Sequence, residues 1–218
     1  MCGRFSLETS AKDLAHQFKL LNEPDWNPRY NIAPTQGALM IRADDHGMRA
    51  ETTSWGFRPP WLKEGEKGKP LINARAETAA EKRTFAESFA KRRCLVPASS
   101  FFEWQKKAGQ KLPWLLHLPD SPAFAMAGLW QDLDDGPRFT ILTLEAVGEA
   151  KQVHSRMPWI LSDAQLQPWL NGETQNVPEP SQTLGAGLQR YRVSPRVNKV
   201  AYNAPDCIAP IGDDELLF

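Results

Sequence analysis

The feature that most constrains the fold is the shortness of the apolar runs, because turn-forming residues interrupt them throughout the chain. The 218 residues include 18 prolines and 14 glycines, and these two residues mark turns and end regular structure. Short apolar or alternating runs, which are typical of strands, lie at 38–43, 94–96, 101–104, 114–118, 124–128 and 139–144. We therefore expect strands to outnumber helices, and no helix to be long.

Three short helices are predicted from capping patterns, in which a small polar residue is followed three residues later by a polar partner. The pairs are Ser10 with Asp13, Thr84 with Glu87, and Ser162 with Gln165. In the first helix Leu14, Phe18 and Leu21 share one face, in the second Phe85 and Phe89, and in the third Leu166, Trp169 and Leu170.

The fold class follows from the order of these segments. No regular strand–helix–strand rhythm is present, which favours an α+β domain on a curved, mainly antiparallel sheet with short peripheral helices. The proline-rich segment 171–180 reads as a surface loop, because too little chain follows it to form a second core. We expect one domain over residues 1–218, with a loose acidic tail at about 211–218.

Charge and cysteine content exclude several classes of protein. The net charge is zero, which disfavours a general polyanion binder, although residues 56–111 hold 13 basic and 6 acidic residues. That segment is either a localised anion-binding groove or a solvated charged face. The chain has no run long enough to span a membrane and no secretory signal. Its three cysteines have no metal-binding spacing, so we expect a cytoplasmic monomer without metal or cofactor.

The second residue carries unusual chemistry. If Met1 is removed, Cys2 presents an α-amine with a pKa of roughly 7.7–8.0 and a thiol with a pKa near 8.5 on neighbouring carbons. An aldehyde would react with the amine to give an imine, and the thiol would then close a five-membered thiazolidine ring. A cysteine at position 2 also occurs by accident, so this interpretation needs support from the rest of the chain.

Three further residues are candidates for the same chemistry. Glu103 lies in the aromatic run 101–104, where partial desolvation would raise the pKa of its carboxyl group. His154 is a proton shuttle near neutral pH, and Asn73 is a polar amide that enters an apolar run and needs partners if buried. Each also has a purely structural interpretation. Glu103 could be an outward-facing residue of a strand, His154 could make a structural hydrogen bond, and Asn73 could be a turn residue at the end of a strand.

Aromatic and basic residues alternate in the middle of the chain. Trp55, Trp61 and Trp104 accompany a set of arginines there, namely Arg58, Arg75, Arg83, Arg92 and Arg93. Stacking rings beside guanidinium groups are the composition of a channel for single-stranded nucleic acid. Core packing is the alternative for each tryptophan, and we expect it for one or two of them.

Several short strings resemble the SRAP (SOS-response-associated peptidase) family, whose members are abasic-site processing proteins. They occur in family order from residue 1 to about 200: MCGRF at 1–5, RYNIAPT at 29–35, WGF at 55–57, INARAET at 72–78, RCLVPA at 93–98, FEW at 102–104, AGLW at 127–130 and HSRMP at 154–158. One departure is Ser100, which stands where the family usually has glycine and is expected to alter the approach to Glu103. The segment at Val197 and Asn198 matches the family's tail only loosely.

The resemblance implies a pseudo-barrel fold and covalent capture of abasic sites in single-stranded DNA through a thiazolidine at Cys2. It implies that Asn73 binds near the Cys2 terminus and the opened sugar, that Glu103 moves protons at the Cys2 amine, and that His154 assists opening of the deoxyribose ring. For DNA contacts it implies phosphate binding by arginines and a tryptophan wedge; the candidates are Arg4, Arg75, Arg83, Arg156, Trp55, Trp61 and Trp104. The peptidase name implies self-removal of Met1.

Two other function classes remain open. An N-terminal-nucleophile amidohydrolase also begins with Met-Cys-Gly, but it needs an oxyanion hole, often an Asn-Gly pair; here Ala74 follows Asn73. A non-covalent single-strand binding module is the third reading. It predicts that Cys2→Ala leaves all function intact, whereas the first predicts loss of the covalent product.

Overall fold

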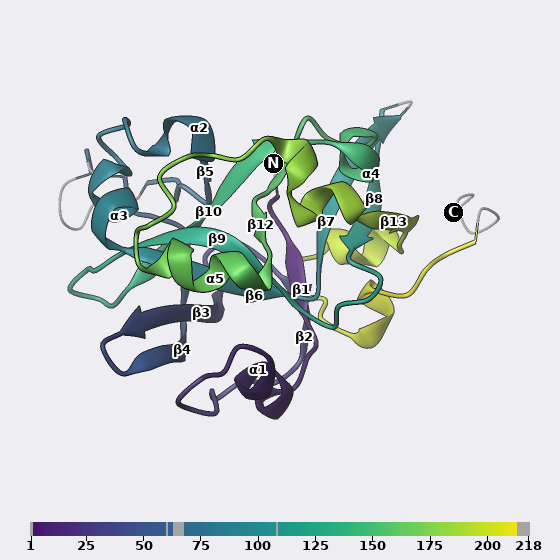
Figure 1. Cartoon of the computed structure of the whole chain (residues 1–218). Coiled ribbons are helices and arrows are strands. Elements are labelled where there is room, and N and C mark those ends of the chain that lie inside the picture. Colours follow the sequence, from purple (N-terminus) through teal and green to yellow (C-terminus); the bar gives the residue numbers. More distant parts are fainter. Residues whose placement is uncertain (1, 60, 63–67, 108, 213–218) are drawn as a thin grey trace.

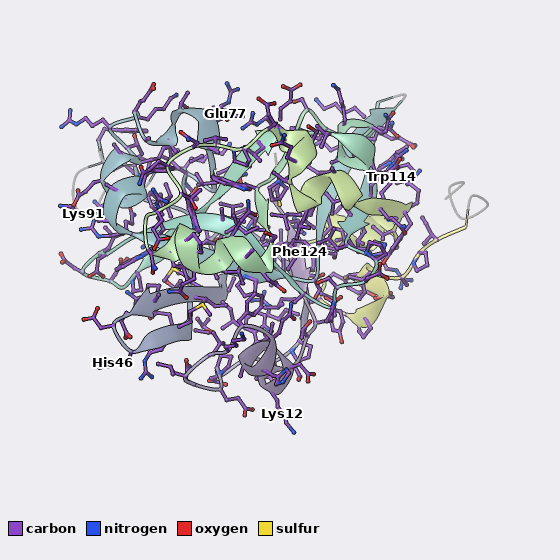
Figure 2. All side chains as sticks on the ribbon, viewed as in Figure 1. Lys12, His46, Glu77, Lys91, Trp114 and Phe124 are labelled. Atoms are coloured by element: carbon purple, nitrogen blue, oxygen red, sulfur yellow. The ribbon has the colours of Figure 1, made fainter. Side chains whose placement is uncertain are left out.

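A computed structural model describes residues 2–59, 61–62, 68–107 and 109–212. It shows an α+β domain in which two sheets pack together and short helices lie at the periphery (Figure 1). The side chains of Lys12, His46 and Lys91 project outward from the edges of the molecule, whereas Phe124 is buried (Figure 2). The prediction of an α+β fold with mainly antiparallel strands is confirmed.

The first sheet has five antiparallel strands in the order β13-β8-β7-β1-β2. Its strands are β1 (Phe5–Leu7), β2 (Arg29–Ile32), β7 (Ser100–Lys107), β8 (Gln110–His117) and β13 (Gln189–Arg192). The N-terminal strand β1 lies in the interior of this sheet, so the residues just before Phe5 enter the centre of the molecule (Figure 1).

The second sheet is mixed and closes on itself. Its strands are β3 (Gly37–Asp44), β4 (Gly47–Trp55), β5 (Asn73–Arg75), β6 (Arg93–Ala98), β9 (Phe124–Gln131), β10 (Arg138–Glu145), β11 (Arg156–Pro158) and β12 (Ile160–Leu161). The pairings β10–β4–β3–β6–β9 return to β10 through the β9–β10 ladder. We call this ring of five strands the barrel. Strand β10 also pairs in parallel with β5, through residues 141–143 of β10.

The helices are short, as predicted. They are α1 (Ala11–Gln17), α2 (Ala76–Ala79), α3 (Ala86–Lys91), α4 (Gly148–Lys151) and α5 (Asp163–Leu170), with 3-10 turns at η1 (Pro180–Gln182), η2 (Leu184–Gly187), η3 (Pro195–Asn198) and η4 (Pro205–Cys207). The segment 171–179 between α5 and η1 contains no regular element, in agreement with the predicted loop.

Two of the three predicted caps are confirmed. Ser10 caps α1 by accepting a hydrogen bond from the backbone of Asp13, and Ser162 forms a capping box with Gln165 at the start of α5. The predicted cap at Thr84 is wrong, because α3 begins at Ala86 without any side-chain cap.

The predicted apolar faces of the first two helices need one correction. In α3, Phe85 and Phe89 are buried as predicted, and their burial positions this short helix. In α1, Leu14 and Phe18 are buried, but Leu21 is 49% exposed. Lys19 adopts a positive φ of 50° directly after the helix, so the chain reverses before it reaches Leu21.

Tryptophans are among the largest fully buried side chains of the core. Trp55, Trp159 and Trp169 are fully buried. The Trp55 ring stacks on Phe139 at 6.4 Å between ring centroids and meets the edge of Phe5 at 5.1 Å. Because Phe5 belongs to β1, this contact attaches the first sheet to the barrel and places the N-terminal segment against it.

Two predicted features lie wholly or partly outside the described residues. Met1, whose removal the chemistry of Cys2 requires, is one of them, and residues 213–218 of the predicted acidic tail are the other. None of the helices in the described part of the chain combines the length and the apolar character that crossing a membrane requires.

Candidate functional site

A pocket of about 530 Å³ opens beside the half of the β7–β8 hairpin that is nearer the turn. Seven residues line it: Arg4, Glu103, Trp104, Lys106, Lys111, His154 and Asn198. They come from the segment before β1, from β7 and β8, from the turn after α4 and from η3. The pocket therefore joins segments that are far apart in the sequence.

Cys2 is fully buried and is held by Asn73. The Asn73 side-chain amide donates a hydrogen bond from Nδ2 to the carbonyl oxygen of Cys2 at 2.7 Å. Asn73 is the first residue of β5, where it pairs in parallel with Ile141 of β10. Its Oδ1 is buried and has no hydrogen-bond partner among the described residues. A buried acceptor that lacks a partner is costly, and it leaves Asn73 able to accept one further hydrogen bond.

The thiol of Cys2 is kept neutral by its surroundings. Burial raises its pKa, and the nearby carboxylate of Glu103 raises it further. Its Sγ lies 3.8 Å from the carbonyl oxygen of Arg4, which accepts the weak S–H donor. A thiol in this environment becomes a nucleophile only when a neighbouring base takes its proton.

Glu103 has the properties of a proton carrier. It is only 4% exposed, and burial raises the pKa of its carboxyl group to about 7. Its neighbours in β7, Phe101 and Phe102, are also buried. At neutral pH this carboxyl group therefore exists in both protonation states.

His154 follows α4 and lines the same pocket. Its Nδ1 lies 3.0 Å from the backbone nitrogen of Arg156 and 3.3 Å from the carbonyl oxygen of the same residue, so it accepts from the N–H in one tautomer and donates to the carbonyl in the other. Burial is the main cause that lowers its pKa, and at neutral pH the ring is mostly uncharged. A ring of this kind can exchange protons near neutral pH.

Ser100, which departs from the family pattern, does not approach Glu103 directly. Side chains alternate along a strand, so residues 100 and 103 of β7 point to opposite faces. The Ser100 hydroxyl is buried and shares a 2.6 Å hydrogen bond with the hydroxyl of Ser6. The expected effect on the approach to Glu103 stays a prediction, and the extra side chain links β7 to β1.

Two lysines stand opposite each other at the mouth of the pocket. Lys106 of β7 pairs with Lys111 of β8 in the antiparallel register, and both are exposed. Like charges directly opposite in a sheet are destabilising, whereas they favour the approach of an anion. This pair gives the pocket a positive rim.

The whole chain was compared with known proteins. The family model for "SOS response associated peptidase (SRAP)" matches residues 1–200. The chain belongs to the SRAP family.

Curated SRAP relatives from distant organisms align over most of the chain. It is 36% identical to the abasic site processing protein YoqW of Bacillus subtilis, with 95% of this chain and 99% of the relative covered. It is 28% identical to the abasic site processing protein YedK of Escherichia coli over 97% and 100% of the two chains. The corresponding HMCES protein of Gallus gallus is 26% identical over 97% of this chain and 78% of its own.

A solved structure shares the fold. A crystal structure of a protein from Bacteroides thetaiotaomicron superposes with a TM-score of 0.76 at 22% identity, over 96% of this chain and all of the other.

The residues expected to contact DNA in this SRAP protein are arranged unevenly. Arg4 and Trp104 line the pocket. Trp61 is 67% exposed, and Arg75 and Arg83 are also exposed, but none of these three is part of the pocket lining. Their roles stay predictions.

Two of the expected DNA contacts conflict with the structure. The prediction for Trp55 is wrong, because its ring is fully buried in the barrel and its Nε1 donates to the carbonyl of Ile72 at 2.9 Å. Arg156 forms a two-pronged ion pair with Glu77, with both N–O distances at 2.7 Å. A phosphate would have to displace that carboxylate first.

The described basic residues of segment 56–111 differ in their surroundings on this SRAP protein. Arg93 is buried, and its guanidinium lies over the rings of Phe89 and Trp169. Arg92 pairs with Glu87 at 3.1 Å. Among the described residues of this segment, the basic side chains that line the pocket are Lys106 and Lys111 of the β7–β8 hairpin.

Sequence reasoning missed Lys106, Lys111 and Asn198 as pocket residues. The two lysines become neighbours only through the register of the hairpin, and Asn198 reaches the pocket through a 3-10 turn near the end of the chain. Among the described residues, no group of three or more His, Cys, Asp or Glu side chains is arranged to hold a metal ion.

Proposed function

We propose that this protein processes abasic sites in single-stranded DNA by forming a thiazolidine between its N-terminal Cys2 and the aldehyde of the opened sugar. Membership of the SRAP family and the names of its curated relatives support abasic sites as the substrate. The observation that carries the proposal is the grouping at Cys2, whose carbonyl is held by Asn73 while Glu103 is close enough to raise the pKa of its thiol.

The reaction begins with removal of Met1, which frees the Cys2 amine. The neutral amine adds to C1′ of the open-chain sugar and gives a carbinolamine, which loses water and becomes an imine. The thiol sulfur then adds to the imine carbon while the imine nitrogen takes up a proton. The net change is the loss of one water, so no oxidant or cofactor is required.

Glu103 serves three proton transfers of this sequence. In its carboxylate form it accepts a proton from the attacking amine, and in its acid form it protonates the departing hydroxyl so that it leaves as water. A pKa of about 7 makes both forms available at neutral pH. Because the thiol of Cys2 is neutral when buried, Glu103 is also the base that allows ring closure.

His154 acts earlier, on the sugar. An abasic deoxyribose is mostly a closed hemiacetal, and opening it requires a proton on the ring oxygen and removal of one from the hydroxyl. The imidazole of His154, which lines the pocket, supplies the first of these transfers from its N–H group. Asn73 holds the main chain of Cys2 in place and offers its free Oδ1 to the amine or to a sugar hydroxyl.

The test is incubation of the purified protein with a single-stranded oligonucleotide that carries one abasic site. We expect a heat-stable adduct on a denaturing gel, with an intact mass equal to the protein without Met1 plus the DNA minus one water. A borohydride-reduced abasic site, which lacks the aldehyde, is the matched substrate control. An active protein that retains Met1, or an adduct with the reduced site, would overturn the proposal.

Strand preference is tested in the same assay. Intact duplex has no exposed base faces for Trp104, so the yield should fall when a complementary strand is annealed. Equal yields on both substrates would contradict the single-strand part of the proposal while leaving the chemistry at Cys2 intact.

A further inference from the structure

Trp104 is held by a direct hydrogen bond to Asn198. The indole Nε1 donates to the Asn198 side-chain Oδ1 at 2.6 Å, and both residues line the pocket. Trp104 is partly exposed and Asn198 is exposed. Water is available to satisfy an indole N–H in such a position, so satisfying this donor does not require Asn198. What the bond adds is a fixed direction for the ring.

The segment that carries Asn198 is itself firmly attached to the N-terminal part of the chain. The carbonyl oxygen of Val197 accepts hydrogen bonds from Nη1 of Arg4 at 2.7 Å and from Nδ2 of Asn31 at 3.2 Å. Asn31 also donates to the carbonyls of Lys199 and Tyr202, at 3.1 and 2.6 Å.

Hydrogen bonds that the C-terminal segment accepts from β2, together with apolar packing, complete this attachment. The Asn203 side chain accepts from the backbone N–H groups of Tyr30 and Asn31 at 2.8 and 3.1 Å. Val197 is buried in a small cluster with Phe102 and Leu115 of the first sheet, and Trp104 packs against it. The position of Asn198 is therefore determined by contacts on both of its sides.

A second contact restrains the same ring. The guanidinium carbon of Arg4 lies 5.7 Å from the centroid of the Trp104 ring, and Arg4 is fixed by its bonds to Asn31 and Val197. The indole is thus restrained at its edge by Asn198 and near its face by Arg4. A ring whose orientation is already fixed loses less freedom when a base stacks on it.

We propose that Asn198 is a positioning residue that fixes Trp104 as the stacking platform for a base next to the abasic residue. The proposal rests on the proposed function, because it takes single-stranded DNA as the ligand of this pocket. Asn198 touches no reacting atom and acts through the orientation of Trp104 alone. It therefore governs how tightly the strand is bound and not how fast the bound aldehyde reacts.

The first measurement is the concentration dependence of the crosslinking rate for Asn198→Ala. We expect the half-saturating concentration of abasic single strand to rise about 10-fold, which is within the range for loss of part of one base-stacking contact. The rate at saturation should stay within about twofold of the parent. Asn171→Ala, another exposed asparagine with a side-chain hydrogen bond, is the matched control and should change neither value.

A double-mutant cycle separates positioning from a general structural role. Trp104→Phe retains a stacking ring but lacks the N–H, so adding Asn198→Ala to it should cause no further loss. Asn198→Asp keeps an acceptor oxygen and should restore parental binding at high salt, where its added charge is screened. An undiminished effect of Asn198→Ala in the Trp104→Phe background, or a fall in the saturated rate, would overturn the proposal.

The failure of this proposal is distinguishable from failure of the proposed function. The four proteins of the cycle are the parent, Asn198→Ala, Trp104→Phe and the double variant. Each is titrated with a single strand that has no abasic site, and binding is followed by fluorescence anisotropy, which requires no covalent chemistry. If the parent forms no adduct, the proposed function fails, but the cycle for non-covalent binding still decides the role of Asn198. Equal affinity of all variants for the intact strand would reject the role of Asn198 even if the adduct forms normally.

Discussion

The barrel and the pocket are held together by different forces. In the barrel, strands close into a ring around fully buried rings such as Trp55 and Phe139, and apolar packing dominates. Around the pocket, directed polar contacts such as Asn73 to Cys2 and Arg4 to Asn31 hold the important groups. Packing energy spreads over many neighbours, whereas a directed contact fixes one group. Substitutions should therefore change stability in the barrel and chemistry or binding in the pocket.

The largest expected effect comes from comparing two buried thiols. Burial raises the pKa of both Cys2 and Cys94, but only the pKa of Cys2 is also raised by Glu103, which lines the pocket. Cys2→Ala should abolish the heat-stable adduct and leave only an imine that borohydride traps. Cys94→Ala, in β6 of the barrel, should keep the adduct rate within about twofold and lower the free energy of unfolding by about 1 kcal/mol. A heat-stable adduct of Cys2→Ala would contradict this contrast.

The next effect concerns the proton carrier. Glu103→Gln preserves shape and hydrogen bonding but cannot exchange a proton, so adduct formation should slow by about 10²–10⁴-fold. By microscopic reversibility, release onto competing abasic DNA should slow as well. Time courses of formation and release check both. A variant that slows formation but releases normally would show that Glu103 only orients the amine.

The pKa of Glu103 also predicts a dependence of stability on pH. Its folded-state pKa, about 7, lies above the ordinary glutamate value. The folded state therefore holds the proton more tightly, and its contribution to stability is fully present below about pH 4.3. That contribution is lost as pH rises toward and through 7. Urea unfolding of the parent and Glu103→Gln at pH 5 and pH 8 should show a smaller decline for the variant.

Two tryptophans give a contrast of intermediate size. Trp55→Ala should lower the free energy of unfolding by about 3–5 kcal/mol, since it empties a fully buried site in the barrel. Trp104→Ala should cost less than about 1 kcal/mol in stability but weaken binding of a single strand by about 1–3 kcal/mol. Urea titrations measure the loss of stability, and anisotropy measures the loss of affinity. If Trp104→Ala cost more stability than Trp55→Ala, the proposed contrast between the barrel and the pocket would be rejected.

The smallest expected effect is at the rim of the pocket. Lys106→Gln should reduce the slope of log affinity against log salt concentration by about 0.7, the loss of one phosphate contact on a single strand. It should also stabilise the protein by about 0.2–1 kcal/mol, because Lys111 no longer faces a like charge. Lys12→Gln, on α1 and away from the hairpin (Figure 2), serves as the control and should change neither quantity.

The same division explains what the sequence could predict. The six apolar runs became strands and two caps were correct, because these signals depend on residues within a few positions of each other. Strand β4 was missed because only Ala50, Thr53 and Trp55 of its nine residues are buried, which weakens the apolar pattern. The closure of the barrel depends on the β9–β10 pairing and could not be seen in any local run.

For the site, chemistry was easier to predict than geometry. Cys2 was singled out by its position, and Glu103 by its aromatic neighbours, without knowledge of the fold. The contacts that hold the pocket join residues 71 positions apart for Asn73 and Cys2 and 193 apart for Arg4 and Val197. No local pattern reports such contacts. The error at Trp55 has the same origin, because composition does not reveal which face of a strand a ring occupies.

The contacts of Arg4 and Asn31 with residues 197–203 have a consequence for biosynthesis. Translation proceeds at about 5–20 residues per second, so Cys2 leaves the ribosome roughly 10–40 s before the segment that completes its pocket. If Met1 is cleaved during that interval, a bare aminothiol meets free aldehydes with nothing around it to select among them. The order of cleavage and folding therefore decides what fraction of newly made molecules reaches DNA with a reactive N-terminus.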